Sequence, residues 1–324
     1  MAIITTDIEE AAKVLDTNNV VAIPTETVYG LAGNIYSQIA INKIYAIKQR
    51  PHYNPLIVHI ASVLQLPKIA AEIPPLAQKL AEIFWPGPLT LVLKKQPEVP
   101  GWVTAGKDTV AVRVPAHPVA LSLLKQLQYP LAAPSANPFT TISPTTARHV
   151  QDYFEGKIPL ILDGGACEAG IESTIVGFRG NEPVVYRLGS LTIEQIEAVT
   201  GKLELFNKQE KQPEAPGMLL KHYSPKKPLY LTDDVARLAE NFSDKKIAVL
   251  ALREVVKSKN IVYCKVLSVS GNLREAAANL YHTMHLLDAT DADVIIAEKM
   301  PGEGYGRAIN DRLERASKPI NTRK

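Results

Sequence analysis

The sequence predicts an α/β protein made of two domains, and three observations carry that prediction. The chain has 324 residues, more than the ~250–300 at which a single hydrophobic core usually stops growing. Strand-like and helix-like segments alternate over 229–324, as is typical of a small parallel α/β domain. The segment 206–228 is polar, contains prolines and has no period, which is typical of an interdomain linker. We therefore expect domains at 1–205 and 229–324.

Hydrophobic spacing and capping signals define the elements of the first domain. Thr6 and Glu9 have capping-box spacing and predict an amphipathic helix that ends near Asn18. Apolar residues recur at helical spacing over 37–49 and stop before Pro51, which predicts a second helix. The other expected elements are a helix opened by Ser143 and Pro144 and ending near Phe154, a helix at 192–199, and strands at 20–23, 56–60, 89–93, 109–114, 160–165, 173–178 and 184–189.

The second domain shows the clearest alternation in the chain. Its strongest predicted helix runs from Leu273 to Leu287, with apolar residues at helical spacing between them. The strands expected around it lie at 228–232, 246–252, 261–269 and 293–300.

Composition excludes several classes of protein. The 36 Lys+Arg and 33 Asp+Glu residues leave a formal charge of +3, which disfavours a protein built to bind nucleic acid through its phosphates. Cys167 and Cys264 lie far apart and form no CxxC, so neither a disulfide framework nor a zinc knuckle is expected. The first residues do not resemble a signal peptide, and no apolar run reaches ~20 residues. We expect a soluble, cytoplasmic protein with no membrane partner.

Common site motifs are missing from the sequence. There is no GxxxxGK[ST], HExxH or GxSxG. In GEGYGR (302–307), Arg307 occupies the place of the third glycine of a dinucleotide fingerprint, so a tight turn is the better interpretation. His282 and His285 share a helical face without a third ligand nearby, and no metal-ligating residue is predicted.

The unusual residues gather in the first 205 positions, which also hold 18 of the 24 prolines. Small polar residues end or interrupt strands in six segments: PTETVYGL (24–31), KQRPHYNPLIVHI (48–60), VAVRVPAHP (110–118), LAAPSANPF (131–139), GIESTIVGF (170–178) and YRLGS (186–190). Together they supply several hydroxyls and four cations, but no nucleophile–base pair. That inventory is typical of a site that binds phosphates and a small carboxylate and positions them for transfer.

Each segment taken singly also has a simple structural explanation. Hydroxyls in strand-to-helix turns bond to nearby backbone, and Lys48 and Arg50 complement the dipole at the end of a helix. Arg113 is the most telling residue, because it interrupts an apolar strand, where a guanidinium must be paired or face a cavity. A buried structural ion pair and a carboxylate- or phosphate-binding fork both fit that position.

In their order along the chain, PTETVYGL, KQRPHYNPL, the arginine of VAVRVP, APSANPF and IESTIV resemble the YrdC-like family. The additional domain after a linker resembles the family's two-domain branch, the threonylcarbamoyl-AMP synthases. The resemblance implies a twisted mixed sheet with flanking helices in 1–205 and a smaller Rossmann-like parallel α/β domain in 229–324. It also implies synthesis of L-threonylcarbamoyl-AMP and pyrophosphate from L-threonine, bicarbonate or CO₂, and ATP with Mg²⁺. The product would pass to a tRNA threonylcarbamoyl transferase, which modifies the adenosine next to the anticodon.

The resemblance assigns roles position by position. Lys48 and Arg50 are the catalytic cations that face the phosphates, and Arg113 pairs with the amino-acid carboxylate. The residues implied for L-threonine are Thr27, His59, Arg113, Ala133 through its backbone, and Ser173. Those implied for ATP are Lys48, Arg50, Asn54, Thr109, Ser135, Ser143, Arg187 and Tyr223. Tyr223 is expected to fold over the nucleotide, and the linker around 222–224 to act as a lid that excludes water.

Three other functions remain open at this stage. An RNA-binding module would grip double-stranded RNA in a cationic concavity and show salt-dependent tRNA binding, although the small net charge predicts that direct tRNA binding is weak or absent. A carbamoyl-transfer enzyme with another acceptor would use the same pocket without selecting threonine. A nucleotide-binding regulator would bind ATP without turnover.

Overall fold

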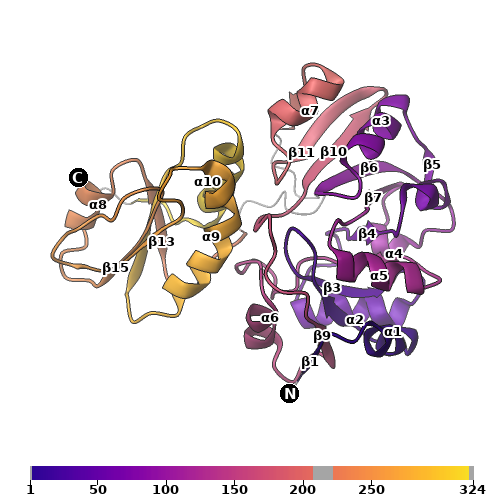
Figure 1. Ribbon diagram of the computed structural model, residues 1–324, viewed down its shortest axis with the longest axis horizontal. Coiled ribbons are helices and arrows are strands. Elements are labelled where there is room, and N and C mark those ends of the chain that lie inside the picture. Colours follow the sequence, from indigo (N-terminus) through magenta and orange to yellow (C-terminus); the bar gives the residue numbers. More distant parts are fainter. Residues whose placement is uncertain (1, 207–221, 321–324) are drawn as a thin grey trace. The chain divides into compact units, whose positions relative to one another are not determined.

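The computed structural model describes residues 2–206 and 222–320 (Figure 1). The chain divides into two compact units, one formed by Met1–Phe139 with Ser143–Leu219 and the other by Thr140–Ile142 with Leu220–Lys324. The expected boundaries of the two domains remain a prediction. Within the described ranges, the helices are too short or too polar to cross a membrane.

The first unit is built on one mixed sheet of 12 strands. The strands are β1 Ile3–Thr5, β2 Val21–Ile23, β3 Gly30–Asn34, β4 Ile57–His59, β5 Ala70–Glu72, β6 Leu89–Lys95, β7 Thr109–Arg113, β8 Leu131–Ala132, β9 Leu160–Leu162, β10 Thr174–Arg179, β11 Glu182–Arg187 and β12 Glu204–Leu205. Their order is β1-β9-β2-β3-β8-β4-β7-β6-β10-β11-β12, with β5 paired to β6. Strands β4 and β7 are parallel whereas β6 and β7 are antiparallel, which confirms the expected mixed sheet.

Helices cover both faces of this sheet. They are α1 Ile8–Asp16, α2 Gln38–Lys48, α3 Pro75–Phe84, α4 Gly101–Thr104, α5 Pro118–Gln126, α6 Ala147–Phe154 and α7 Ile193–Thr200, with a 3-10 helix at Val63–Lys68. Leu15 of α1 and Leu123 of α5 pack with Val21 in one core, whereas neighbouring Ala22 joins a larger core on the opposite face. Successive strand residues point to opposite faces, so apolar runs such as VVAI feed two cores at once.

Two predicted helix starts were wrong. Helix α1 is capped by Asp7, whose Oδ1 accepts from the Glu9 and Glu10 amides, rather than by Thr6. Helix α6 begins after Thr146 rather than after Ser143, because the Ser143 hydroxyl donates to the Glu172 carboxylate instead of capping a helix. A capping box does occur at Thr192, where the predicted helix α7 starts.

Four neighbouring strands place polar residues on one face and the main core on the other. Val58, Val112 and Leu91 point into the larger core. Their strand neighbours therefore face the other side, where the β4–β7 register sets His59 beside Arg113. The registers of β6 with β7 and with β10 bring Thr90 and Ser173, which directly precedes β10, to the same face as His59 and Arg113. The alternation in VAVRV thus turns the arginine away from the core.

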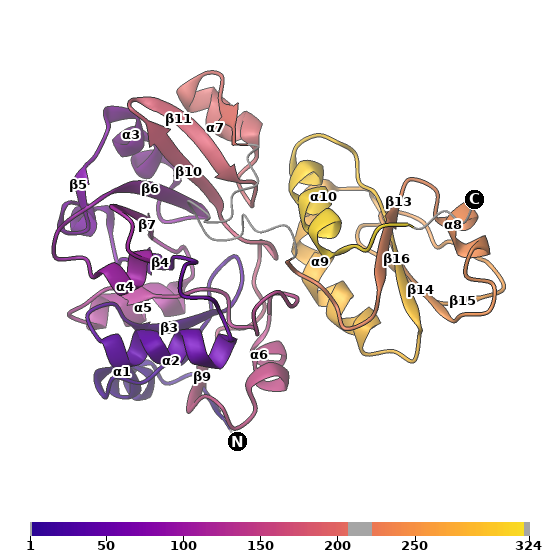
Figure 2. The ribbon, with the colours of Figure 1, turned by 180° about the vertical axis from the view of Figure 1, so that it is seen from behind.

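The second unit is a parallel sheet with three helices (Figure 2). Its elements are β13 Leu229–Thr232, α8 Val235–Glu240, β14 Ile247–Ala251, β15 Ile261–Val266, α9 Leu273–Asp288, β16 Val294–Glu298 and α10 Tyr305–Ala316. The strands are all parallel in the order β13-β16-β14-β15. Both the predicted parallel α/β domain and its strongest helix are confirmed; α9 is capped by Asn272, which accepts from two amides of the first turn.

Candidate functional site

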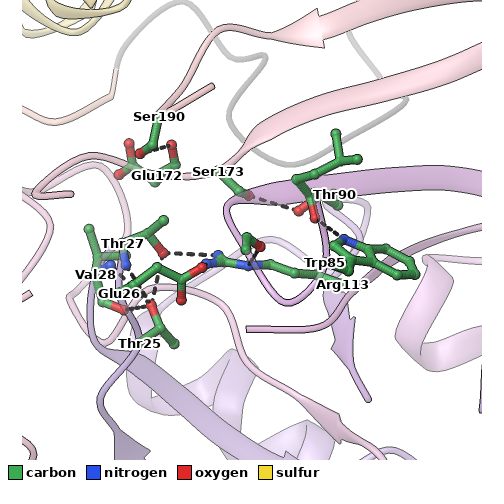
Figure 3. Close-up of polar contacts among 12 residues, drawn as sticks. Thr25, Glu26, Thr27, Val28, Trp85, Thr90, Arg113, Glu172, Ser173 and Ser190 are labelled. Atoms are coloured by element: carbon green, nitrogen blue, oxygen red, sulfur yellow. Dashed lines mark hydrogen bonds and ion pairs between the residues drawn. The ribbon is translucent and has the colours of Figure 1, made fainter. Parts of the chain in front are cut away.

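Arg113 is the centre of the polar face of the first unit (Figure 3). It is only 3% exposed. Its Nε donates to the Gly87 carbonyl at 3.2 Å, and its Nη1 donates to Thr27 Oγ1 at 2.9 Å. Its Nη2 lies 2.5 Å from Glu26 Oε1 in a buried ion pair. The guanidinium is therefore held by two segments, the backbone at Gly87 and the 24–31 loop.

The 24–31 loop is ordered by its own hydroxyls. Thr25 Oγ1 donates to the Val28 carbonyl at 2.6 Å, so the Thr27 hydroxyl is the donor in the 2.8 Å contact between Thr25 and Thr27. The Ala169 amide donates to the Glu26 carbonyl at 2.7 Å. The hydroxyls and backbone contacts of this segment thus hold Thr27 and Glu26 against Arg113.

Ser173 connects two of the expected binding regions. Its Oγ lies 2.7 Å from Thr90 Oγ1. Arg187 Nη2 donates to the Ser173 carbonyl at 2.8 Å and to its hydroxyl at 3.1 Å, and Arg187 Nε donates to the same carbonyl at 3.1 Å. A residue expected to bind threonine and a cation expected to bind ATP are therefore in direct contact.

His59 is buried and uncharged at neutral pH. Burial, followed by the nearby Arg113 charge, lowers the pKa of His59 to about 3, against a smaller opposing effect of the Ile57 carbonyl. Its Nδ1 lies 3.2 Å from that carbonyl, so this nitrogen carries the proton in the neutral ring. The other ring nitrogen is left as a hydrogen-bond acceptor.

We expect His59 to make the fold sensitive to acid. The folded pKa lies below the unfolded value of about 6.5, so the unfolded chain binds the proton first and stability falls as the pH drops below that value. Between pH 7 and about 4.5 the wild type should lose about 2–3 kcal/mol more than His59→Gln. Urea unfolding at both pH values measures this difference, and equal losses in the two proteins would contradict the prediction.

Lys48 lies at the end of α2 and is fully enclosed. It is 1% exposed, and its Nζ donates to the carbonyls of Ser135 and Asn137, both at 2.5 Å. Burial, followed by repulsion from Arg50, lowers the pKa of Lys48 well below its ordinary value. No carboxylate partner of Lys48 occurs in the described part of the chain, so an incoming anion would supply the missing counter-charge.

Arg50 is held in the loop that follows α2. Its Nη2 donates to Asn54 Oδ1 at 2.6 Å and to the Pro55 carbonyl at 2.7 Å, and its Nε donates to the Asn54 carbonyl. Both residues are buried. The structure therefore brings Arg50 and Asn54 together, as expected for one binding region.

Ser143 reaches the site through a carboxylate. It is buried, and its hydroxyl donates to Glu172 Oε1 at 2.6 Å. Glu172 directly precedes Ser173, so Ser143 and Arg187 approach the same short segment from two directions. Ser190 anchors this segment further by donating to the Ile171 carbonyl at 2.7 Å.

The remaining expected residues lie further from Arg113. Thr109 begins β7, four residues before Arg113, so the two side chains share a face about 13 Å apart. The Ala133 amide donates to the Ile57 carbonyl at 3.0 Å, which fixes its backbone beside the start of β4. Tyr223 belongs to the second unit, where its ring stacks on Tyr281; its contact with nucleotide remains a prediction.

The proposed lid can be followed only in part. Of the predicted linker, 207–221 lies outside the described residues. His222 donates its amide to the Arg315 carbonyl, and the Ser224 amide donates to the Thr140 carbonyl at 2.8 Å. Both contacts are within the second unit.

Two acidic residues of the site were missed by the sequence reasoning. Glu26 and Glu172 are 8% and 6% exposed, and each contacts a predicted site residue. Each lies inside a quoted motif and directly beside a predicted threonine-binding residue, which was the available signal. A glutamate next to hydroxyls in a turn is usually solvated, so only its burial marks it as part of the site.

The family models match both units. The Sua5/YciO/YrdC model, described as "Telomere recombination", matches residues 13–189. The model described as "Threonylcarbamoyl-AMP synthase, C-terminal domain" matches residues 191–318. The second match covers the region in which the sequence resemblance rested on the α/β pattern alone.

One solved structure resembles nearly the whole chain, and another resembles a little more than half of it. The structure of Sua5 from Pyrococcus abyssi complexed with L-threonine has a TM-score of 0.90 and 40% identity, covering 98% of this chain and 97% of that one. Escherichia coli YciO has a TM-score of 0.53 and 25% identity, covering 58% of this chain and 96% of that one. The smaller protein thus corresponds to about the length of the first unit.

Curated relatives extend over nearly the whole chain. The threonylcarbamoyl-AMP synthase of Pyrococcus abyssi is 42% identical over 315 residues, covering 95% of this chain and 93% of the relative. That of Bacillus subtilis is 41% identical over 320 residues, covering 96% and 92%. Agreement of this extent, in both units, shows that the chain belongs to the threonylcarbamoyl-AMP synthase family.

Proposed function

We propose that this protein joins L-threonine, bicarbonate and ATP into L-threonylcarbamoyl-AMP, with release of pyrophosphate. The observation that carries the proposal is the contact of Ser173 with both Thr90 and Arg187, beside the Arg113–Thr27 bond. These contacts would connect the cation proposed for the phosphates, Arg187, to a residue proposed for threonine, Ser173. The L-threonine bound in the Pyrococcus abyssi relative supports the same substrate here.

The chemistry requires positioning rather than a protein nucleophile. The amine of threonine attacks the carbon of bicarbonate to form a carbamate, and a carbamate oxygen then attacks the α-phosphorus of ATP as pyrophosphate leaves. Lys48 and Arg50 would stabilise the negative charge that spreads over the phosphates. Both cations are buried and held by backbone carbonyls, so they would need little reorganisation as the reaction proceeds.

The cofactor in this proposal is Mg²⁺ bound together with ATP. When bound, it would neutralise part of the negative charge on the phosphates of ATP. Over 2–206 and 222–320, His, Cys, Asp and Glu do not gather in threes as a metal site requires. In this proposal the ion would be held mainly by the phosphate oxygens of ATP.

The finer expectations belong to the same proposal. The adenylate would pass to a tRNA threonylcarbamoyl transferase in the cytoplasm, with little direct tRNA binding by this protein, and the segment around 222–224 would close the site. A Rossmann-like character of the second unit is supported by its four parallel strands. Its first strand, β13, lies at an edge, whereas the first strand of the dinucleotide-binding order is central.

One assay tests the proposed function. The protein is incubated with ATP, Mg²⁺ and bicarbonate, with and without L-threonine, and pyrophosphate and the adenylate are followed by chromatography. We expect both products only when all the substrates are present. Pyrophosphate release that is indifferent to threonine and bicarbonate would exclude the proposal, and salt-dependent tRNA binding without turnover would favour an RNA-binding module.

Replacing Arg187 with alanine should weaken the binding of ATP more than the binding of threonine. We expect the dissociation constant for ATP to rise about 10–100-fold, because a charged donor is lost. The dissociation constant for threonine should also rise, because Ser173 loses the bonds that hold it, but this indirect effect should be smaller. Titration calorimetry measures both constants. Arg179→Ala is the matched control, since Arg179 forms an exposed ion pair with Glu204 that should contribute little. A threonine constant that rises more than the ATP constant would contradict this assignment.

A further inference from the structure

Glu26 is a buried carboxylate with an incomplete set of contacts. The residue is 8% exposed, and both its oxygens are shielded from solvent. Oε1 lies 2.5 Å from Arg113 Nη2, but the angles of this ion pair are not those of a hydrogen bond. Neither oxygen accepts a hydrogen bond from any residue in the described part of the chain.

Such a carboxylate needs donors. An ionised carboxylate has about four acceptor sites, and a buried polar group without a hydrogen bond carries a substantial desolvation penalty. The other buried carboxylate of the site, Glu172, already accepts the Ser143 hydroxyl. Glu26 is therefore the acidic group with unused acceptor capacity next to Arg113.

Arg113 keeps part of its capacity for a ligand. A guanidinium has five N–H donors; one bonds to Gly87, one to Thr27, and a third faces Glu26. Two donors remain for a substrate carboxylate. In an α-amino acid the ammonium and the carboxylate share one carbon, so a carboxylate bound at Arg113 brings its ammonium close to Glu26.

We propose that Glu26 receives the α-ammonium group of the amino-acid substrate and takes its proton when the carbamate forms. The inference rests on the proposed function, which requires a free amine. The ammonium loses one proton to the Glu26 carboxylate, and its nitrogen bonds to the carbon of bicarbonate. The carbon–hydroxyl bond breaks, and that hydroxyl leaves as water with a second proton from nitrogen. One hydrogen stays on the nitrogen of the carbamate, and total charge is conserved.

Among the neighbouring side chains, Glu26 is the group best suited to accept the proton of the ammonium. His59, on the adjacent strand β4, has a pKa of about 3 because of burial and Arg113, so it is a weak base. Burial raises the pKa of the Cys167 thiol, which is near both Glu26 and Arg113. The hydroxyls of Thr25 and Thr27 are not bases at neutral pH. Arg113 is the charged group in contact with Glu26, and it would keep the substrate carboxylate as its counter-charge once Glu26 is protonated.

The first test is Glu26→Gln, which keeps the shape but cannot take the proton. We expect threonine-dependent pyrophosphate release to fall about 100-fold or more, with ATP affinity close to the wild type. The melting temperature should fall, because Arg113 loses its buried counter-charge. The deficit should narrow as the pH is raised past the pKa of the substrate's amino group, because threonine then arrives as the amine. Glu168→Gln, an exposed glutamate close to Glu26 through Ala169, is the matched control and should stay fully active.

Three results would overturn the inference. They are activity of Glu26→Gln within about threefold of the wild type, a deficit that stays constant with pH, and an equal loss of ATP binding, which would indicate a purely structural role. If the wild type itself gave no threonine-dependent pyrophosphate, the proposed function would fail instead.

A second test does not depend on any variant folding. Wild-type protein is titrated with L-threonine and with 3-hydroxybutyrate, which keeps the carboxylate and the hydroxyl but lacks the amine. A charge-assisted contact between Glu26 and the ammonium should make threonine bind about 10–100-fold more tightly. Equal affinities would show that Glu26 does not face the ammonium. Glu26→Asp, which keeps the charge, should preserve the preference in part.

Discussion

Replacing Arg113 with alanine is expected to abolish threonine-dependent pyrophosphate release and to destabilise the first unit. The buried pair with Glu26 would lose one partner and leave an uncompensated carboxylate, which typically costs about 3–5 kcal/mol. The substrate carboxylate would lose its fork, so the dissociation constant for threonine should rise about 100-fold or more. Affinity for ATP should change little. Calorimetry and urea unfolding measure the two effects separately.

Two further variants separate stability from binding. Arg113→Ala combined with Glu26→Gln removes the unpaired charge, so part of the lost stability should return while threonine binding does not. Arg113→Lys keeps the charge but not the planar fork, so the dissociation constant for threonine should still rise about 10–100-fold. If the double variant regained threonine affinity, Arg113 would be a structural partner of Glu26 rather than the carboxylate site.

Replacing Lys48 with methionine should lower the turnover number about 100–1,000-fold, with a smaller effect on threonine binding. A buried ammonium that contacts the transferring phosphates would act like one donor of an oxyanion hole, and removing one such donor typically has an effect of that size. Methionine fills similar space, so the helix should remain folded. Lys43→Met is the matched control, since Lys43 lies on the same helix and bonds to Asn18 and Asn19 instead. An unchanged turnover number would remove Lys48 from the catalytic assignment.

The lowered pKa of Lys48 predicts that ATP binding is coupled to the uptake of a proton. The pKa of Lys48 is lowered in the free protein by burial and by Arg50, and a bound phosphate would favour the charged form and raise that pKa. At a pH where Lys48 of the free protein is largely neutral, ATP binding should therefore take up a proton. Calorimetry in buffers of different ionisation enthalpy would detect this uptake, which should vanish in Lys48→Met. Uptake that persisted in the variant would assign the proton to another group.

The segments of the site could be predicted because each carries a local signal. A single arginine in VAVRV, prolines around hydroxyls, and cations at a helix end are all visible in the sequence. Strand alternation alone sends Arg113 to the face opposite Val112. The exact start of α1 was not determined locally, since Asp7 and Thr6 are neighbouring residues that are both good caps, and the structure uses Asp7.

The sequence by itself determined the α/β class, the order of the binding segments and the residue types that would meet the substrates. The tertiary structure decided which of them touch. Only the strand order places Ser173 between Thr90 and Arg187, and only burial makes Glu26 a partner of Arg113 rather than a solvated turn residue. The physical reason is that propensity and period act over neighbouring residues, whereas ionic contacts and desolvation depend on segments far apart in the chain.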